Sequence, residues 1–203
     1  MSSTLHMFTY LCRFGAPIPI CRGLIANNTE DIEVAKTLAS KQQILDKDYI
    51  TMTLNCTEFI NKRGYITKPL SKEEETFPIA YSILMYKDVS ATERLLRAIY
   101  QPQNYYVIHV DLKARKVVYD AVDGITKCFP NVWKVRDRYD IKWGYISLLN
   151  AELSSMEQLL LFRKWKYLIN LTGQEFPLWS NRDIVRTLMA FNGANNVEGS
   201  AIL

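Results

Sequence analysis

The residues with the clearest chemical potential stand at the end of an apolar run, in the segment YYVIHVDLK at 105–113. The β-favouring residues Tyr105–Val110 are followed directly by Asp111, and the chain turns basic at Lys113. Asp111 can be interpreted in two ways. An Asp after a strand often caps the following turn or helix. A carboxylate at the carboxyl end of a parallel strand can instead face a ligand crevice. Spacing alone favours the capping interpretation.

The other residue patterns exclude several common kinds of site. The chain has four cysteines without a CxxC pair and only two histidines, which does not fit a zinc site. The first apolar run is followed by MYKDVSATE, which contains neither a GxGxxG nor a Walker sequence. No serine nucleophile elbow is present. A standard dinucleotide-binding fold and a P-loop enzyme are therefore excluded.

The elements that must position Asp111 are predicted by the periodicity of the chain from Phe77 onward. Four apolar runs of strand length alternate with four helical patterns. The strands are expected at Ile79–Tyr86, Tyr105–Val110, Val132–Arg136 and Tyr167–Leu171, and the helices from a capping box at Ser90–Glu93 and over Lys116–Lys127, Ser147–Phe162 and Ser180–Phe191. Strands that are apolar on both faces indicate a parallel sheet covered by helices on both sides. Right-handed crossovers then bring the strand ends to one edge, which is the default ligand crevice.

Residues 1–76 have a different pattern, with helices expected over Glu30–Lys41 and Tyr49–Lys62 and a charged connector at 71–77. The sequence therefore predicts an N-terminal arm at 1–76 and an α/β region at 77–203. The length of 203 residues fits one domain with such an arm. A composition of 48% hydrophobic and 23% charged residues is typical of a folded soluble domain, and the net charge of +4 is low for a nucleic-acid binder.

Three N-x-S/T sequons begin at Asn27, Asn55 and Asn170. Asn170 lies in a predicted buried strand, where a glycan would not fit, so Asn27 and Asn55 are the candidates if the chain is secretory. No stretch reaches the roughly 20 apolar residues of a membrane span. A basic region before an apolar core, as in a secretory signal, is also missing. Taken alone, the N-terminus indicates a cytosolic or incomplete chain.

Five segments in order give the chain a family resemblance. They are FPIAYSILMYKD, RLLRAIYQPQNYYVIHVDLK, WGYISLLNAEL, WKYLINLTGQEFPL and NGANNVE. Together they resemble the Golgi core 2 and I-branching β-1,6-N-acetylglucosaminyltransferases, from the clan that also holds the peptide O-xylosyltransferases. The resemblance implies a GT-A-like fold, UDP-N-acetylglucosamine as donor and a glycan acceptor on a glycoprotein. It also implies inversion at the anomeric carbon, no metal ion, and a Golgi membrane protein facing the lumen.

The resemblance assigns roles to particular residues. The donor-binding positions are Leu84, Met85, Tyr86, Asp111, Leu112, Lys113 and Trp143. Glu198 matches an acceptor-contacting Glu. Tyr86 stands where the family often has His, and Trp143 stands where the core 2 enzymes have a Tyr. As alternatives, Leu84 and Met85 can be core residues, Trp143 a packing residue and Glu198 a solvated acid.

The resemblance also pairs Cys56 with Cys128, which would join the arm to the sheet region. A second family pair is absent, because Val107 and Ser155 occupy its positions. Cys21 matches a third cysteine whose partner would lie beyond residue 203, so we expect it to have no partner within the chain.

The family's catalytic Glu and its diphosphate-binding Arg and Lys match nothing in these residues. We therefore expect these residues to form the N-terminal part of a catalytic domain, with a sheet that is incomplete at its C-terminal side. We expect this part to have no transferase activity by itself. Glu175 lies in a segment that is a structural turn in the family, so it is not expected to replace the base. The alternatives are a non-catalytic remnant that binds nucleotide-sugar or glycan, or a xylosyltransferase-like relative. Nucleic-acid binding by WKVRDRYDIKWGY is disfavoured by the modest net charge.

Overall fold

The computed structural model describes residues 18–41 and 44–196. Contacts between Cα atoms divide the chain into two compact units, one up to Ile44 and one from Leu45 onward. In the first unit, α2 (Ile18–Ile25) contacts α3 (Thr29–Lys41), which agrees with the helix expected there. Asn28 caps α3, because its side-chain oxygen accepts hydrogen bonds from the backbone N–H groups of Glu30 and Asp31. The predicted division at residue 76 stays a prediction.

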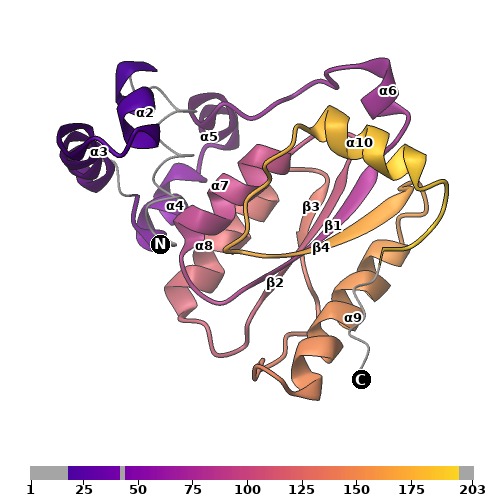
Figure 1. Ribbon diagram of the computed structural model, residues 1–203. Coiled ribbons are helices and arrows are strands. Elements are labelled where there is room, and N and C mark those ends of the chain that lie inside the picture. The colour runs from indigo at the N-terminus through magenta and orange to yellow at the C-terminus, as the bar shows by residue number, and fades with distance from the viewer. Residues whose placement is uncertain (1–17, 42–43, 197–203) are drawn as a thin grey trace, which may run out of the picture. The chain divides into compact units, whose positions relative to one another are not determined.

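The second unit is built on a four-stranded, entirely parallel sheet in the order β3-β2-β1-β4 (Figure 1). The strands are β1 (Ile79–Met85), β2 (Tyr105–Val110), β3 (Val132–Lys134) and β4 (Tyr167–Thr172). Both β2 and β4 pair with β1, so the prediction that these segments share one sheet is confirmed. Every residue of β1 is buried, as its unbroken apolar pattern indicates for a central strand.

Helices lie on both faces of this sheet, as predicted. From β1 to β3 the chain moves in one direction through α7 (Val89–Ile99) and α8 (Lys116–Lys127). It then returns through α9 (Ile146–Leu160) to β4, on the other side of β1. Right-handed crossovers place α7 and α8 on one face and α9 on the other, as Figure 1 shows. The reversal creates a topological switch point between β1 and β4.

The start of α7 differs in detail from the sequence prediction. The helix begins at Val89, and its N-cap is Asp88, whose side chain accepts a hydrogen bond of 2.9 Å from the backbone N–H of Ala91. The expected capping box from Ser90 to Glu93 is therefore wrong. An acid two residues earlier serves as the cap, and Glu93 is free to point into the protein.

The expected helix over Tyr49–Lys62 is two helices, α4 (Asp46–Met52) and α5 (Cys56–Arg63). The break comes from Asn55, whose side chain accepts a 3.1 Å hydrogen bond from the backbone N–H of Glu58 and so starts a new helix. Part of the expected charged connector is also helical, as the short α6 (Lys72–Glu75).

The apolar pattern of the helix expected over Ser147–Phe162 places Leu149, Leu153, Met156 and Leu160 inward, but α9 turns a different face toward the sheet. Its buried residues are Ala151, Ser155 and Leu159, whereas Leu149 and Leu153 are 46% and 51% exposed. Small side chains at the first two positions let the helix approach β1 and β2 closely.

The strand after α9, β4, is an edge of the described sheet. Asn170 on this strand is exposed, so the expectation that it is buried is wrong.

The predicted disulfide is present. Cys56 at the start of α5 is bonded to Cys128 at the end of α8, with their Cα atoms 4.9 Å apart. The bond closes a loop across 72 residues of sequence, and chain entropy alone makes such a bond worth about 4 kcal/mol. The side chain of Cys21 lies outside the described residues, so the expectation about its partner stays a prediction.

A buried carboxylate joins three of the helices above the sheet. Glu93 on α7 has a fully buried side chain, and it accepts hydrogen bonds from Arg63 Nε at 3.0 Å and from the hydroxyl groups of Tyr65 and Tyr49 at 3.2 and 3.4 Å. Arg97 is a second ion-pair partner, at 3.5 Å. Two guanidinium groups and two hydroxyl groups therefore satisfy one buried charge, which α4 and α5 share with α7.

We predict that Glu93→Gln lowers the free energy of unfolding by about 3 kcal/mol, because it leaves buried guanidinium charge without its partner. Urea denaturation measures this loss. Glu58→Gln is the matched control, since Glu58 and its partner Lys62 are half or more exposed and such a helical pair is worth at most about 0.5 kcal/mol. Losses of similar size in the two variants would contradict the role given to Glu93.

Candidate functional site

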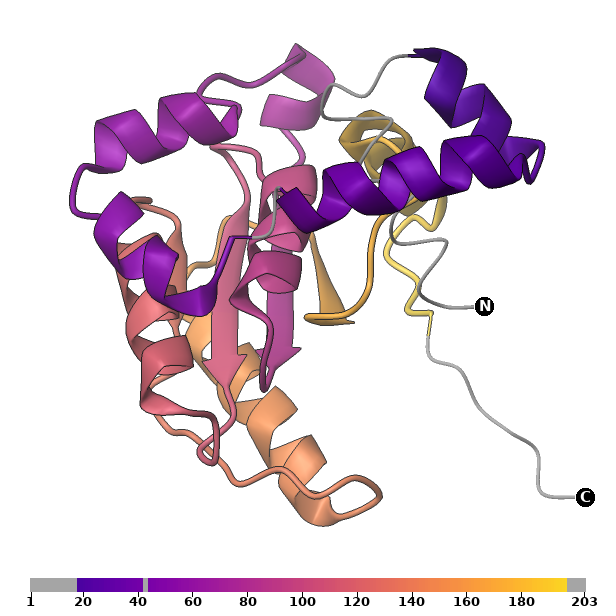
Figure 2. The ribbon, with the colours of Figure 1, turned by 90° about the vertical axis from the view of Figure 1, so that its left-hand side faces the viewer.

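The carboxyl ends of three strands meet at one edge of the sheet, and Figure 2 shows neighbouring strands ending with their arrowheads in one direction. The backbone N–H of Asp111 after β2 donates to the carbonyl of Met85 at 2.8 Å. The N–H of Gly173 after β4 donates to the carbonyl of Leu84 at 2.8 Å. A Cβ atom at Gly173 would lie 3.0 Å from Met85 Cβ, so glycine permits this close approach. The edge includes the switch point between β1 and β4, and open parallel sheets bind ligands at such points.

Asp111 is only 3% exposed, and the chain itself occupies most of its carboxylate. One oxygen accepts a 2.9 Å hydrogen bond from the backbone N–H of Lys113. The other accepts one of 3.3 Å from the backbone N–H of Ile141 and lies 3.1 Å from Lys113 Nζ. Asp111 therefore caps the turn that follows β2, as the capping interpretation predicts. It also lies at the carboxyl end of a parallel strand, as the crevice interpretation requires. A carboxylate offers roughly four acceptor sites, and three are taken here.

The segment 135–145, which we call the crossover loop, joins β3 to α9 and is fixed to the end of β2. Arg138 Nε donates to the carbonyl of Val110 at 2.8 Å, and its Nη2 donates to that of Asp111 at 2.6 Å. The backbone N–H of Leu112 donates to the carbonyl of Tyr139 at 3.0 Å. These bonds hold the backbone of the loop and the strand end in one arrangement.

Lys113 adds further contacts between the strand end and the crossover loop. Its Nζ donates to the Asp140 carboxylate at 3.0 Å and also to the carbonyl of Ile141. The Asp140 and Asp111 carboxylates raise the pKa of Lys113, although desolvation opposes them, and keep it cationic. The ammonium group also lies 5.5 Å from the centre of the Tyr86 ring. Because its side chain is 42% exposed, the Lys113 charge is available at the surface.

His109 fixes the crossover loop from beneath. Its side chain is fully buried, and Nε2 accepts a 3.0 Å hydrogen bond from the backbone N–H of Tyr139. That bond requires Nε2 to be unprotonated, so the proton of the neutral ring is on Nδ1, which has no hydrogen-bond partner among the described residues. Burial lowers the pKa of His109, and the nearby Asp111 charge opposes this effect only in part.

The predicted donor residues fall into two groups. Leu84 and Met85 are buried, at 8% and 5% exposure, whereas Tyr86 and Leu112 present 47% and 54% of their surface. Of these side chains, Tyr86 lies beside Lys113, whose ammonium group is 5.5 Å from the centre of its ring. Trp143 lies in the crossover loop with 91% of its surface exposed. Glu198, the predicted acceptor residue, lies outside the described residues.

Sequence reasoning did not identify Arg138 or His109 as parts of this site. Arg138 belongs to the basic and aromatic segment WKVRDRYDIKWGY, and its side chain binds carbonyl groups of the protein's own backbone. His109 stands two residues before Asp111, on the same side of β2, and this spacing is the signal that could have identified it.

The side chain of Glu175 folds back on its own turn, where it accepts a hydrogen bond from the backbone N–H of Thr172. Its backbone N–H donates to the carbonyl of Thr172 at 3.1 Å, which agrees with the expected structural turn. Within residues 18–41 and 44–196, His, Cys, Asp and Glu side chains form no group of three able to hold a metal ion.

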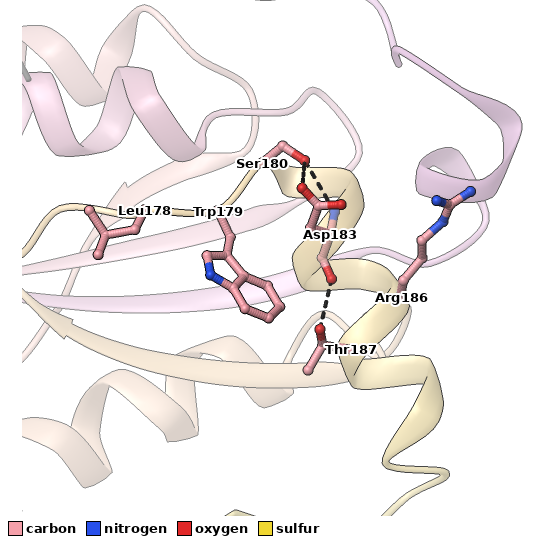
Figure 3. A pocket seen from close by; sticks show the side chains of 6 residues that line it. All are labelled: Leu178, Trp179, Ser180, Asp183, Arg186 and Thr187. Carbon is pink, nitrogen blue, oxygen red and sulfur yellow. Dashed lines mark hydrogen bonds between the residues drawn. The ribbon is translucent and has the colours of Figure 1, made fainter.

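Two hollows lie away from the strand ends. One of about 670 Å³ is bounded by α9, β4 and α10 (Asn181–Ala190), and its apolar lining includes Leu160, Trp165 and Phe191. Another of about 380 Å³ surrounds the start of α10, where Figure 3 shows the Trp179 ring beside the hydrogen-bonded Ser180 and Asp183. Neither hollow is lined by a predicted donor residue.

Comparison with known proteins identifies the class of this α/β protein. A family profile described as "Core-2/I-Branching enzyme" matches residues 79–201, and the chain belongs to this family. A Bos taurus beta-1,3-galactosyl-O-glycosyl-glycoprotein beta-1,6-N-acetylglucosaminyltransferase is 43% identical over 185 residues, which is 88% of this chain and 43% of the relative. Its Homo sapiens counterpart is 47% identical over 152 residues, 74% of this chain and 36% of the relative.

A Rattus norvegicus enzyme of the same name with the number 3 is 38% identical over 184 residues, 88% of this chain and 42% of the relative. The chain thus spans less than half the length of these curated relatives. The predicted family resemblance is confirmed. Among the described helices, none is both long and apolar enough to cross a membrane.

We predict that the stability of the sheet unit falls as the pH is lowered through about 6.5, the ordinary pKa of histidine. The lowered folded-state pKa of His109 means that the unfolded chain binds the proton more readily, so acid favours unfolding. One such proton contributes a slope of at most about 1.4 kcal/mol per pH unit. Urea denaturation between pH 7.5 and 5, together with exchange of the Tyr139 amide, measures the effect.

His109→Gln should remove this part of the slope while the rest of the acid sensitivity remains. His6→Gln, which changes the chain's other histidine, is the control and should leave the slope intact. A pH profile that is the same in wild type and His109→Gln would refute the prediction.

Proposed function

We propose that this chain provides the nucleotide-sugar-binding part of a branching β-1,6-N-acetylglucosaminyltransferase, with UDP-N-acetylglucosamine as donor and an O-glycan or related glycan as acceptor. The single observation that carries the proposal is the contact between Tyr86 after β1 and Lys113 after β2, at the carboxyl edge of a parallel sheet and beside its switch point, with the crossover loop fixed against the segment 111–113. Open parallel sheets bind nucleotides in this position.

The exposed groups at the strand ends suit a nucleoside diphosphate. The Tyr86 ring and the Leu112 side chain offer apolar and aromatic surface for a base or ribose. The remaining acceptor site of the Asp111 carboxylate can receive a hydrogen bond from uridine, and Lys113 supplies a positive charge for phosphate oxygens. Arg138 acts indirectly, because its bonds to the carbonyl groups of Val110 and Asp111 fix the backbone that carries these groups.

The reaction that we propose inverts the anomeric carbon by direct displacement and uses no metal ion. In such a transfer, fixed cationic side chains stabilise the charge that develops on the leaving diphosphate. Lys113 is the candidate cation at this edge, and the family's Arg and Lys would complete the set. By resemblance, the exposed Trp143 is proposed on the donor side and Glu198 on the acceptor side.

We further propose that the protein works in the Golgi lumen, held at the membrane by an anchor. The disulfide between Cys56 and Cys128 supports an oxidising compartment, since such bonds are rare in the cytosol. The sequons at Asn27 and Asn55 are consistent with the same route.

Donor binding is tested by calorimetry of residues 1–203 with UDP and UDP-N-acetylglucosamine. We predict that Lys113→Ala weakens binding about tenfold, as the loss of one charge-assisted hydrogen bond implies. Asp111→Asn should weaken it further, because it also loosens the crossover loop. Lys72→Ala is the matched control, since Lys72 is a lysine whose side chain is 81% exposed on α6. Added EDTA should change nothing.

Binding that is equally strong in Lys113→Ala and Lys72→Ala would place the donor elsewhere and overturn the proposal. A transfer assay with a core 1 acceptor tests activity directly. We expect no turnover from residues 1–203 alone, because loss of a positioned base costs about 10²–10⁴-fold. Clear transfer would show that a base lies within these residues.

A further inference from the structure

We propose that Asn55 is an N-glycosylation site whose occupancy is set by a competition with closure of the Cys56–Cys128 disulfide. The inference rests on the secretory location given under the proposed function. It concerns a sequon, Asn55-Cys56-Thr57, whose middle residue is itself one half of the disulfide. Two covalent reactions therefore act on neighbouring side chains.

The folded protein has room for a glycan at Asn55. Asn55 and Thr57 are both exposed, and the preceding Leu54 is 83% exposed. The N-cap bond uses the side-chain oxygen of Asn55, which accepts from the backbone N–H of Glu58 at 3.1 Å. A glycan is attached to the other atom of the amide, Nδ2. The modification therefore leaves the cap of α5 intact, and the folded structure tolerates it.

The same structure hinders the addition of the glycan once folding is complete. The side-chain oxygen of Asn55 is engaged by α5, and Thr57 lies within the helix. Cys56 ties this first turn covalently to the end of α8. A transferring enzyme must take the Asn side chain and its flanking backbone into an active site, and a cross-linked helix start cannot be drawn out for this. Addition therefore has to precede the disulfide.

The distance between the two cysteines in sequence sets the time available. Cys128 follows Cys56 by 72 residues. At a synthesis rate of about 5–20 residues per second, the sequon is exposed for roughly 4–14 s before Cys128 is made. Disulfide formation takes seconds to hours, so the two reactions proceed on overlapping time scales.

The chemistry of the two steps is separate. In the first, Nδ2 of Asn55 bonds to C1 of an oligosaccharide, a lipid diphosphate leaves, and one amide proton passes to a base of the transferring enzyme. In the second, the thiols of Cys56 and Cys128 lose two protons and two electrons, which reduce the disulfide of an oxidoreductase to a dithiol. Neither reaction reverses on this time scale. Whichever reaction finishes first therefore decides whether Asn55 carries a glycan.

The experiment is translation of the full 203-residue chain behind a cleavable secretion signal, in the presence of endoplasmic-reticulum vesicles. Asn27→Gln and Asn170→Gln remove the other two sequons, so that a glycosidase-sensitive shift in mobility reports Asn55 alone. We expect a mixture of modified and unmodified chains. Cys128→Ala should raise the modified fraction about twofold, as removal of one of two competing steps of similar rate requires.

Three controls separate the competition from other effects. Thr57→Ala destroys the sequon and keeps the Asn55 cap, so the shift should vanish. Cys12→Ala removes a cysteine that lies outside this disulfide and should leave the modified fraction unchanged. Glu93→Gln destabilises the same helices while keeping both cysteines, so an unchanged fraction assigns the competition to the disulfide rather than to folding in general.

No shift in any variant, Cys128→Ala included, would overturn the site. A modified fraction that is equal in wild type and Cys128→Ala would overturn the competition. Nucleotide-sugar binding is measured separately on unglycosylated protein, so a failure of this inference and a failure of the proposed function are distinguishable.

Discussion

The pairing of β1 on both sides is the constraint on which the rest of the structure depends. Because β2 and β4 are both parallel to β1 and both hydrogen-bonded to it, their carboxyl ends must lie at the same edge. The chain reaches β2 through α7 and returns to β4 through α9, so the direction of winding reverses at β1. The switch point, the packing of Gly173 and the position of Asp111 all follow from this arrangement.

The crossover loop shows how an irregular segment is held without regular secondary structure. Its backbone groups are bonded to His109 below and to Asp111 beside it, and Arg138 returns bonds to the carbonyl groups at the end of β2. Each bond joins residues about 30 positions apart in sequence. The loop and the strand end therefore form one unit. An exposed residue of the loop, such as Trp143, is attached to a backbone that is held in place.

Much of the fold could be predicted because its signals are local or periodic. The run Tyr105–Val110 defined a strand to the residue, and the family resemblance gave the bond between Cys56 and Cys128. The buried face of α9 was missed because leucines mark the expected stripe, whereas the close approach to the sheet uses Ala151 and Ser155. The bonds of His109 and Arg138 depend on the path of an irregular loop, which has no sequence period.

Glu93 and Asp111 are buried to a similar degree, and the comparison shows why burial alone is not enough to mark a functional acid. Glu93 is enclosed by two arginines whose side chains are 13% and 7% exposed. If a ligand replaced Glu93 as the partner of either arginine, a buried charge would be left unpaired. Among the described residues, the one ion-pair partner of Asp111 is Lys113, whose side chain is 42% exposed. Lys113 can turn toward a bound phosphate and remain solvated. The Asp111 carboxylate is then still held by the backbone N–H groups of Lys113 and Ile141. This lower cost of exchanging a partner is compatible with the binding role proposed for Asp111, and Glu93 does not offer it.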